Sequence, residues 1–186
     1  LHLLRARKAL TIVGTPTMRN SLQRATTLPE LLITLALLAL LSTYAVPSFA
    51  KWVASNKQQT LREKVLHSLQ MARTQAVLKN RTLELCGSAD ALDCDGHWHK
   101  GWILRAAANK EILAVEQLPQ VDLPLRWNGA RDYLVFRGNG QTPLSNGRFI
   151  LCDDDGKLLW QLIISRQGRV RLATAKENLG EAHRCI

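Results

Sequence analysis

The run from Leu31 to Ala50 constrains the fold of this chain more than any other stretch, because it contains no charged residue. As a helix rising about 1.5 Å per residue, it would cover roughly 30 Å, the thickness of the hydrocarbon core of a bilayer. Its hydroxyl side chains can bond back to carbonyls of their own helix; they are Thr34, Ser42, Thr43 and Ser48. A helix of a soluble core rarely stays apolar on every face for this length. The run therefore predicts a transmembrane helix over residues 26–50.

Basic residues before the run predict the orientation of this helix. Five of the 25 Lys and Arg residues lie before position 26, whereas none of the 15 acidic residues does. Such a bias favours a cytoplasmic N-terminus, so we expect a single membrane span with the bulk of the chain exported. Without the residues before position 26, 20 basic and 15 acidic residues leave a charge of +5. This charge permits an anionic partner without requiring one.

The number of cysteines also fits an exported domain. The four cysteines are Cys86, Cys94, Cys152 and Cys185. An even number in an oxidising compartment predicts two disulfides, although four cysteines allow three connectivities. Of these connectivities we favour Cys86–Cys94 together with Cys152–Cys185, the second of which would tie the end of the chain to a strand.

Beyond the apolar run, the helix is expected to become amphipathic over residues 51–80 and to end near Lys79. Apolar residues recur there at spacings of three and four; they are Leu61, Val65, Leu69, Ala72 and Ala76. From Thr82 onward, short apolar runs broken by turn residues predict antiparallel strands. The expected strands are 83–86, 102–107, 112–118, 125–127, 133–137, 148–152, 158–165 and 169–173. The predicted fold class is α+β, a long N-terminal helix packed on a β-rich head over residues 81–186.

A basic stretch near the end of the chain is the strongest candidate for binding a ligand. Residues two apart in a strand point to the same face, so Arg169 and Arg171 are expected to form a cationic fork that follows Gly168. Further basic residues lie nearby in sequence: Arg166, Lys176 and Arg184. Such a patch can bind phosphates with little dependence on sequence. The alternatives are solvated arginines on an edge strand, or contacts with a neighbouring subunit.

The segment from Cys94 to His99 could be interpreted as a metal site, since His97 and His99 would share a face if they lay in a strand. A cysteine in a disulfide cannot bind a metal, however, and the sequence offers no third ligand. We therefore favour a turn followed by a packed Trp98. We expect no metal, no cofactor and no enzymatic activity, because the sequence shows neither a nucleophile paired with a base nor a glycine-rich phosphate loop.

The stretch RATTLPELLITLALLALLSTYAVPSFA resembles the N-terminus of type IV pilins and type II secretion pseudopilins. The resemblance implies that residues 1–25 contain a leader, for which Met18 is the more plausible start. A prepilin peptidase would cut between Ala25 and Thr26, where the family usually has glycine and phenylalanine, and Thr26 would be methylated. Glu30 would then be the fifth mature residue, which in the family pairs with the N-terminal amine of a neighbouring subunit.

The second half resembles a narrower family, the GspH/FimT minor pilins. The matching blocks are CGSADALDCDGHWHKGWIL, YLVFRGNGQTP, NGRFILC and SRQGRVRLA. In FimT-like members a GRxR motif belongs to a DNA-binding surface used in DNA uptake, and here this motif is Gly168, Arg169 and Arg171 with Val170 between the arginines. The resemblance thus implies a pilin-like fold with other pilins, the peptidase, the inner membrane and double-stranded DNA as partners.

Three hypotheses for function follow. The first is a minor pilin with a structural role in assembling or priming a type IV pilus or a type II secretion pseudopilus. The second is a minor pilin that binds double-stranded DNA as a receptor in natural transformation. The third is a membrane-anchored periplasmic domain that joins no filament.

Overall fold

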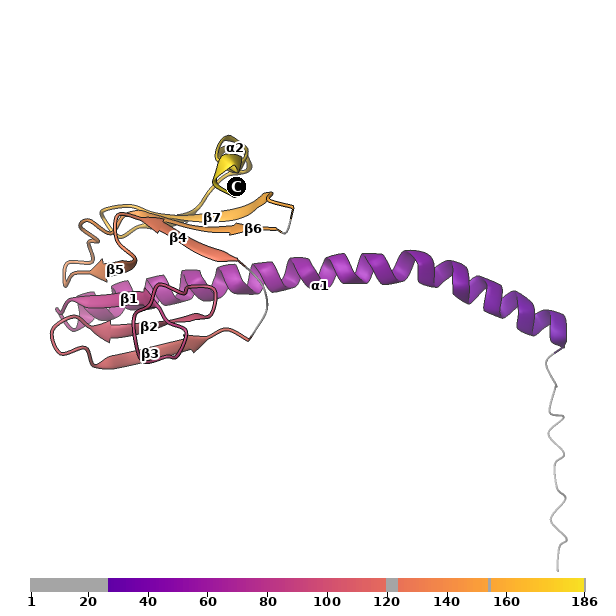
Figure 1. The fold of residues 1–186 in the computed structure, drawn as a ribbon, viewed down its shortest axis with the longest axis horizontal. Helices are drawn as coiled ribbons and strands as arrows, with labels where there is room; N and C mark the ends of the chain where they lie inside the picture. The colour runs from indigo at the N-terminus through magenta and orange to yellow at the C-terminus, as the bar shows by residue number, and fades with distance from the viewer. Residues whose placement is uncertain (1–26, 120–123, 154, 186) are drawn as a thin grey trace, which may run out of the picture. The chain divides into compact units, whose positions relative to one another are not determined.

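The computed structural model describes residues 27–119, 124–153 and 155–185. The chain divides into two compact units, Leu1–Phe49 and Ala50–Ile186. One helix, α1 (Leu28–Leu78), belongs to both units and ends within one residue of the helix expected from the sequence. All eight strands and a short C-terminal helix lie in the second unit. The fold is α+β, as predicted (Figure 1).

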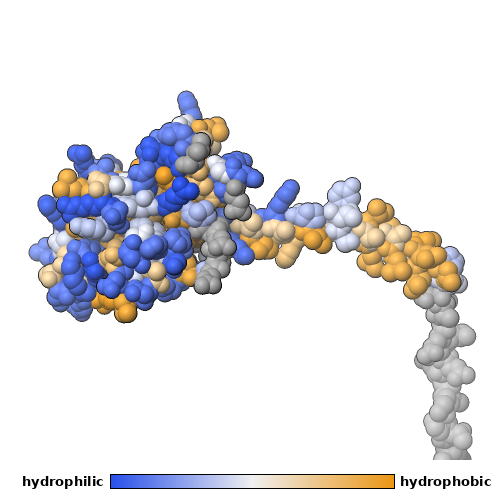
Figure 2. Space-filling model, viewed as in Figure 1, coloured by the Kyte–Doolittle hydropathy of each residue, from blue (hydrophilic) through white to orange (hydrophobic). Residues whose placement is uncertain are grey.

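In the first unit, α1 is apolar and exposed throughout. Its side chains form a continuous hydrophobic surface (Figure 2), and the helix is long and apolar enough to cross a membrane. Three hydroxyls donate to carbonyls three residues earlier, as expected: Thr34 to Leu31 (2.8 Å), Ser42 to Ala39 (2.9 Å) and Thr43 to Leu40 (2.7 Å). These bonds satisfy the hydroxyl donors within the helix itself.

In the second unit, α1 buries the predicted apolar stripe. The five predicted residues are at most 4% exposed: Leu61, Val65, Leu69, Ala72 and Ala76. Ser68 lies on the same face, where its hydroxyl accepts a hydrogen bond from Nε1 of Trp102 (2.9 Å). The buried polar group therefore has a partner, as buried polar groups require.

The strands form two antiparallel sheets of four strands each. The first sheet has the order β3 (Ile112–Gln117), β2 (Gly101–Ala106), β1 (Leu83–Gly87), β5 (Tyr133–Phe136). The second has the order β4 (Leu125–Gly129), β6 (Gly147–Cys152), β7 (Leu158–Ile164), β8 (Val170–Leu172). All eight predicted strands are present, with ends that differ by one or two residues. The sequence predicted neither the division into two sheets nor the strand order.

One hydrophobic core joins the helix to both sheets of the second unit. It contains the α1 stripe, the inward residues of the first sheet, such as Leu85 and Leu104, and those of the second, such as Phe149 and Leu162. Strand alternation supplies these residues, since every second side chain of a strand points to the same face. Trp98, Trp102 and Trp160 are buried and Trp127 is half-buried against this core, which confirms the packing predicted for Trp98.

The end of the chain forms two short helical segments that the sequence analysis did not anticipate. The helix α2 (Ala175–Gly180) begins with a capping box, in which the side chains of Thr174 and Glu177 bond to each other's backbone N–H. A 3₁₀ turn, η1 (Ala182–Cys185), follows. A capping box satisfies two N–H groups that a helix start otherwise leaves unpaired.

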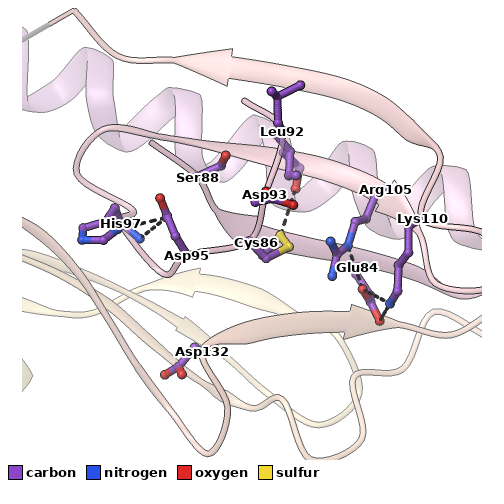
Figure 3. Close-up of a disulfide and its surroundings, with 12 residues drawn as sticks. Glu84, Cys86, Ser88, Leu92, Asp93, Asp95, His97, Arg105, Lys110 and Asp132 are labelled. Atoms are coloured by element: carbon purple, nitrogen blue, oxygen red, sulfur yellow. Dashed lines mark hydrogen bonds and ion pairs between the residues drawn. A yellow bond between two sulfur atoms is a disulfide. The ribbon is translucent and has the colours of Figure 1, made fainter. Parts of the chain in front are cut away.

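Both disulfides favoured from the sequence are formed, Cys86–Cys94 and Cys152–Cys185. Figure 3 shows Cys86 on β1, close in sequence to Glu84, whose carboxylate bonds to Arg105 and Lys110. The shortest contacts of Glu84 are 2.9 Å to Nε of Arg105 and 2.9 Å to Nζ of Lys110. Glu84 is nearly buried, and these two cations compensate its charge.

Candidate functional site

The turn between β7 and β8 presents two arginines to solvent. Its backbone closes through bonds from Gly168 N to Ser165 O (2.8 Å) and from Ser165 N to Arg169 O (3.0 Å). Gly168 has a φ of +73°, a conformation that glycine adopts without strain. Arg166 and Arg169, on either side of the turn, are exposed.

This turn packs against the loop that follows β5. Thr142 of the loop donates its backbone N–H to Arg166 O (2.9 Å) and its hydroxyl to Ser165 O (2.8 Å). Gly168 is buried against Gly140, and a Cβ at position 168 would overlap the carbonyl oxygen of Gly140. The sequence motif thus requires glycine for a second reason besides its φ angle, namely the close approach of another backbone.

A third element, α1, reaches the same place through Arg73. Its Nε donates to Gly140 O (3.1 Å). Arg137, an exposed residue at the start of the loop, accepts a bond from Gly140 N at its carbonyl oxygen (2.8 Å). Arg73, Arg137, Arg166 and Arg169 therefore belong to the three segments that meet at the contact between Gly140 and Gly168, and we call these four residues the arginine cluster.

The arginine cluster carries charge that no carboxylate neutralises within the part of the chain that the structure describes. None of its four members forms an ion pair there. The contacts of Arg166 and Arg73 are with neutral groups, the side-chain oxygen of Asn146 (3.4 Å) and the carbonyl of Gly140. Guanidinium groups arranged in this way can bind phosphates, two N–H donors at a time.

Arg171 has a different environment from Arg169. Arg169 directly precedes β8 and Arg171 lies within it, on either side of Val170, which packs against the core, and both arginines are exposed. Arg171, however, donates both Nη atoms to the carboxylate of Glu177, at 2.9 and 2.7 Å. This bond with Arg171 and a bond from Thr174 N lower the pKa of Glu177 to about 2. Of the two arginines of the predicted fork, Arg171 is therefore already paired with a carboxylate, whereas Arg169 is not.

The other basic candidates do not join the arginine cluster. Arg184 of η1 forms an ion pair with Glu181, and the hydrogen bond with Arg184 is the main cause of the lowered pKa of Glu181. Lys176 is exposed on α2. Among the six residues predicted to bind DNA, only Arg166, Gly168 and Arg169 belong to the surface around Gly140.

The two histidines considered as metal ligands lie in a turn and not in a strand, since β2 begins at Gly101. Cys94 is bonded to Cys86, and Nδ1 of His97 lies 3.1 Å from Asp95, as Figure 3 shows. Trp98 between them is buried, with its ring 4.8 Å from that of Phe149. The segment thus packs a tryptophan against the core, as the preferred interpretation held.

Comparison with known protein families shows which family the chain belongs to. Residues 62–168 match the family model described as "Type II transport protein GspH". The chain belongs to the GspH family. The match covers more than half of the chain, including most of the second unit, and ends at Gly168. Arg169, Arg171 and the C-terminal helical segments of this GspH-family protein lie beyond it.

A solved structure supports the same assignment. The type IV minor pilin FimU of Pseudomonas aeruginosa PAO1, in one crystal form, is 27% identical with a TM-score of 0.53, over 67% of this chain and 94% of FimU. In a second crystal form the identity is 28% and the TM-score 0.49, over 63% of this chain and 94% of FimU. No curated protein sequence gives a significant match. Family and fold are those of structural pilins, so this GspH/FimT-like minor pilin is a structural component of a pilus or pseudopilus.

The residues expected to act in assembly lie at the start of α1. Glu30 is in the first turn of the helix, where a negative charge is favoured by the helix dipole. Ala25 and Thr26, the expected cleavage site, lie outside the described residues. Their roles therefore stay predictions from the resemblance to pilins.

Sequence reasoning missed Arg73 and Arg137 as members of the arginine cluster. In the sequence, Arg73 falls within the predicted amphipathic helix 51–80, and Arg137 at the end of the predicted strand 133–137. Their approach to Gly168 depends on contacts between segments far apart in the chain, such as the hydrogen bond from the side chain of Arg73 to the carbonyl oxygen of Gly140. Gly140, the second of the two glycines between Arg137 and Gln141, was the available sequence signal of such a close contact.

Proposed function

We propose that this GspH-family protein is anchored in the inner membrane by α1, with its second unit in the periplasm, and enters a type IV pilus or type II secretion pseudopilus by packing α1 among other pilin helices. The observation that carries this proposal is the apolar surface of α1 in the first unit. Large side chains there are more than half exposed, for example Leu31 at 52% and Leu41 at 66%. A surface of this size on a soluble protein marks a contact with a membrane or a partner.

Glu30 sets the axial position of α1 relative to the neighbouring pilin helices. A carboxylate near the hydrocarbon costs on the order of 2–3 kcal/mol unless it has a partner. The N-terminal amine of a neighbouring subunit, exposed by cleavage between Ala25 and Thr26, is a partner of opposite charge. We infer that pairing of this amine with Glu30 compensates the cost only when the helix is docked in a filament.

The substitution Glu30→Ala tests this role. The variant is expected in the membrane fraction at normal amounts and absent from filaments sheared off the cell surface or from purified pseudopili. Glu63→Ala, which removes an exposed glutamate from the second unit's part of the same helix, is the control and should enter filaments normally. Incorporation of Glu30→Ala at the level of the control would contradict the proposal.

The arginine cluster supports a second candidate function, binding of double-stranded DNA. Four unneutralised arginines from three segments suit a phosphate backbone, which binds basic side chains largely without regard to base sequence. The GRxR motif, which the GspH/FimT resemblance connects with DNA uptake, contributes Arg169 to this cluster. The minor pilin would then serve as a DNA receptor in natural transformation while it remains a filament subunit.

This candidate is tested with the full chain in detergent, by fluorescence anisotropy of a labelled DNA duplex across a salt series. Binding should weaken steeply with salt, with a slope of about 0.9 in log–log units for each phosphate contact. The double variant Arg166→Ala, Arg169→Ala should lose most of the affinity and slope. Arg62→Ala, whose arginine pairs with Glu63 on α1, should bind like the wild type. Equal binding by the double variant would argue against a DNA site at the cluster.

In a naturally transformable host, the same double variant should abolish DNA uptake and leave filaments intact. Loss of filaments would instead assign the two arginines to contacts between subunits. Normal uptake would count against the receptor function.

A further inference from the structure

The outer face of the second sheet carries a second pair of arginines, distinct from the arginine cluster. Strand register aligns Arg148 of β6 with Ile163 of β7, and Ile163 with Arg171 of β8. Arg148 and Arg171 are therefore two strands apart on one face, with backbones about 10 Å from each other. We call these two residues the sheet pair.

Both arginines of the sheet pair are covered by carboxylates of the C-terminal segment, Thr174–Cys185. Glu177 forms the two-bond contact with Arg171, and Glu181 lies 3.1 Å from Nη1 of Arg148. Glu181 also pairs with Arg184 of its own segment. A carboxylate that binds two N–H groups of one guanidinium occupies the geometry that a phosphate would use.

The C-terminal segment is held in place mainly by polar contacts. No residue of α2 is buried, and Leu179 is 79% exposed. Besides the ion pairs, Asn178 accepts a bond from Gln161 of β7 (3.1 Å). Its start continues from β8, and its end is anchored through the disulfide of Cys185 with Cys152, in a small apolar cluster with Ile150 and Leu158. The part between these two attachments can thus lift from the sheet while both ends stay in place.

We propose that the C-terminal segment is a displaceable acidic cover, in which Glu177 and Glu181 compete with DNA phosphates for Arg171 and Arg148. The inference rests on the proposed DNA binding at the arginine cluster. DNA first bound at Arg166 and Arg169 lies next to Arg171 along the chain. Neighbouring phosphates of the same duplex then displace Glu177 and Glu181, and the DNA-binding surface extends from the arginine cluster to the sheet pair. Ion pairs near the surface are weak, and both pairs reach solvent, with side chains 54% and 38% exposed for Arg171–Glu177 and 25% and 28% for Arg148–Glu181, so a polyanion at high local concentration can replace them.

The test uses the full chain in detergent and the labelled duplex across the same salt series. The variant Glu177→Gln, Glu181→Gln removes the competing charges, and glutamine at position 177 can still complete the capping box with Thr174. Glu63→Gln, Glu111→Gln is the control, because it removes the same charge from two other exposed glutamates. The first variant should bind more tightly than the control, with a salt slope steeper by about 0.9 for each added phosphate contact.

A second substitution assigns any gain to the sheet pair. Adding Arg148→Ala and Arg171→Ala to the Glu177→Gln, Glu181→Gln variant should return the affinity and slope to those of the control. Persistence of the gain after this addition would overturn the inference, as would a glutamine variant that binds like the control.

Hydrogen exchange gives a readout on the wild-type protein. Saturation with the duplex should increase exchange of the Thr174 amide, which donates to the carboxylate of Glu177 and loses this bond when DNA displaces that carboxylate. Unchanged exchange at saturating DNA would contradict displacement.

The outcomes separate this inference from the proposed function. Wild-type binding that depends on Arg166 and Arg169, together with a glutamine variant equal to the control, overturns the cover alone. Binding by the glutamine variant but not by the wild type supports the cover and shows that the cluster by itself is insufficient. Absence of binding in every variant overturns both.

Discussion

At the scale of single residues, Gly168 fixes the geometry of the arginine cluster. Its φ of +73° and its contact with Gly140 leave no room for a side chain. We predict that Gly168→Ala lowers the free energy of unfolding by about 1–3 kcal/mol, the usual cost of such backbone strain. Urea unfolding of the chain in detergent, followed by tryptophan fluorescence, measures this loss.

Gly180→Ala is the matched control, because a Cβ at position 180 meets nothing within 4 Å. The control should unfold within a few tenths of a kcal/mol of the wild type, as surface substitutions usually do. Equal stability of the two variants would mean that the turn does not pack on the loop as described.

The ion pair of Glu177 should make stability depend on pH. Its pKa in the folded protein is about 2, below the ordinary value of 4.5. A carboxyl group with a lowered pKa stabilises the fold above its unfolded pKa and loses this contribution as pH falls through the folded pKa. The difference in unfolding free energy between the wild type and Glu177→Gln should therefore shrink between about pH 4.5 and pH 2.

Unfolding of both proteins at several pH values checks this expectation, with Glu63→Gln as a variant of equal charge. A difference between wild type and Glu177→Gln that stays constant over this range would show that Glu177 does not hold Arg171 in solution.

Only some residues of the site could be predicted from the sequence. Arg169 could be singled out because its motif is local. The ion pair between Arg171 and Glu177 could not be predicted, since nothing in the spacing of the two residues shows that α2 turns back onto β8. Arg73 is brought to the site by a contact with Gly140, 67 positions along the chain.

At the scale of secondary structure, the apolar stripe of α1 anchors the helix in the second unit. Leu69 is fully buried, and Leu69→Ala should cost about 2–5 kcal/mol of stability. The same substitution at Leu78, which is 79% exposed, should cost little. Chemical unfolding of both variants makes the comparison, and equal stability would show that α1 does not pack against the sheets.

The two disulfides should contribute unequally. The loop closed by Cys152–Cys185 has a sequence separation of 33, against 8 for Cys86–Cys94. In the loop-entropy model these separations correspond to roughly 4 and 2.5 kcal/mol. Replacing each pair by serines and measuring thermal unfolding should give the larger loss for Cys152–Cys185; the reverse order would rule out loop entropy as the main cause.

Helices and strands could be predicted where the residue pattern that specifies them is local in the sequence. The period of the apolar residues from Leu61 to Ala76 specifies one buried helix face, and turn residues such as Asp155-Gly156 separate the strands. Strand order was not predictable, because the pairing of β1 with β5 and of β4 with β6 depends on contacts between distant segments. The short helix α2 was not predicted, because it has no buried face.

At the scale of the whole molecule, the two units present different surfaces. The apolar surface of α1 in the first unit needs a membrane or neighbouring helices, whereas the second unit buries its own core and exposes charged side chains. This division suits a subunit that moves from a membrane into a filament. The GspH family model and the likeness to FimU agree with such a subunit.

The most direct test of filament entry is the intact mass of the protein in sheared filaments or purified pseudopili, compared with that in membranes. We predict that the filament fraction contains a chain that begins at Thr26 and carries one added methyl group. Recovery of the protein only from membranes, with the residues before Thr26 still attached, would contradict incorporation as a processed pilin.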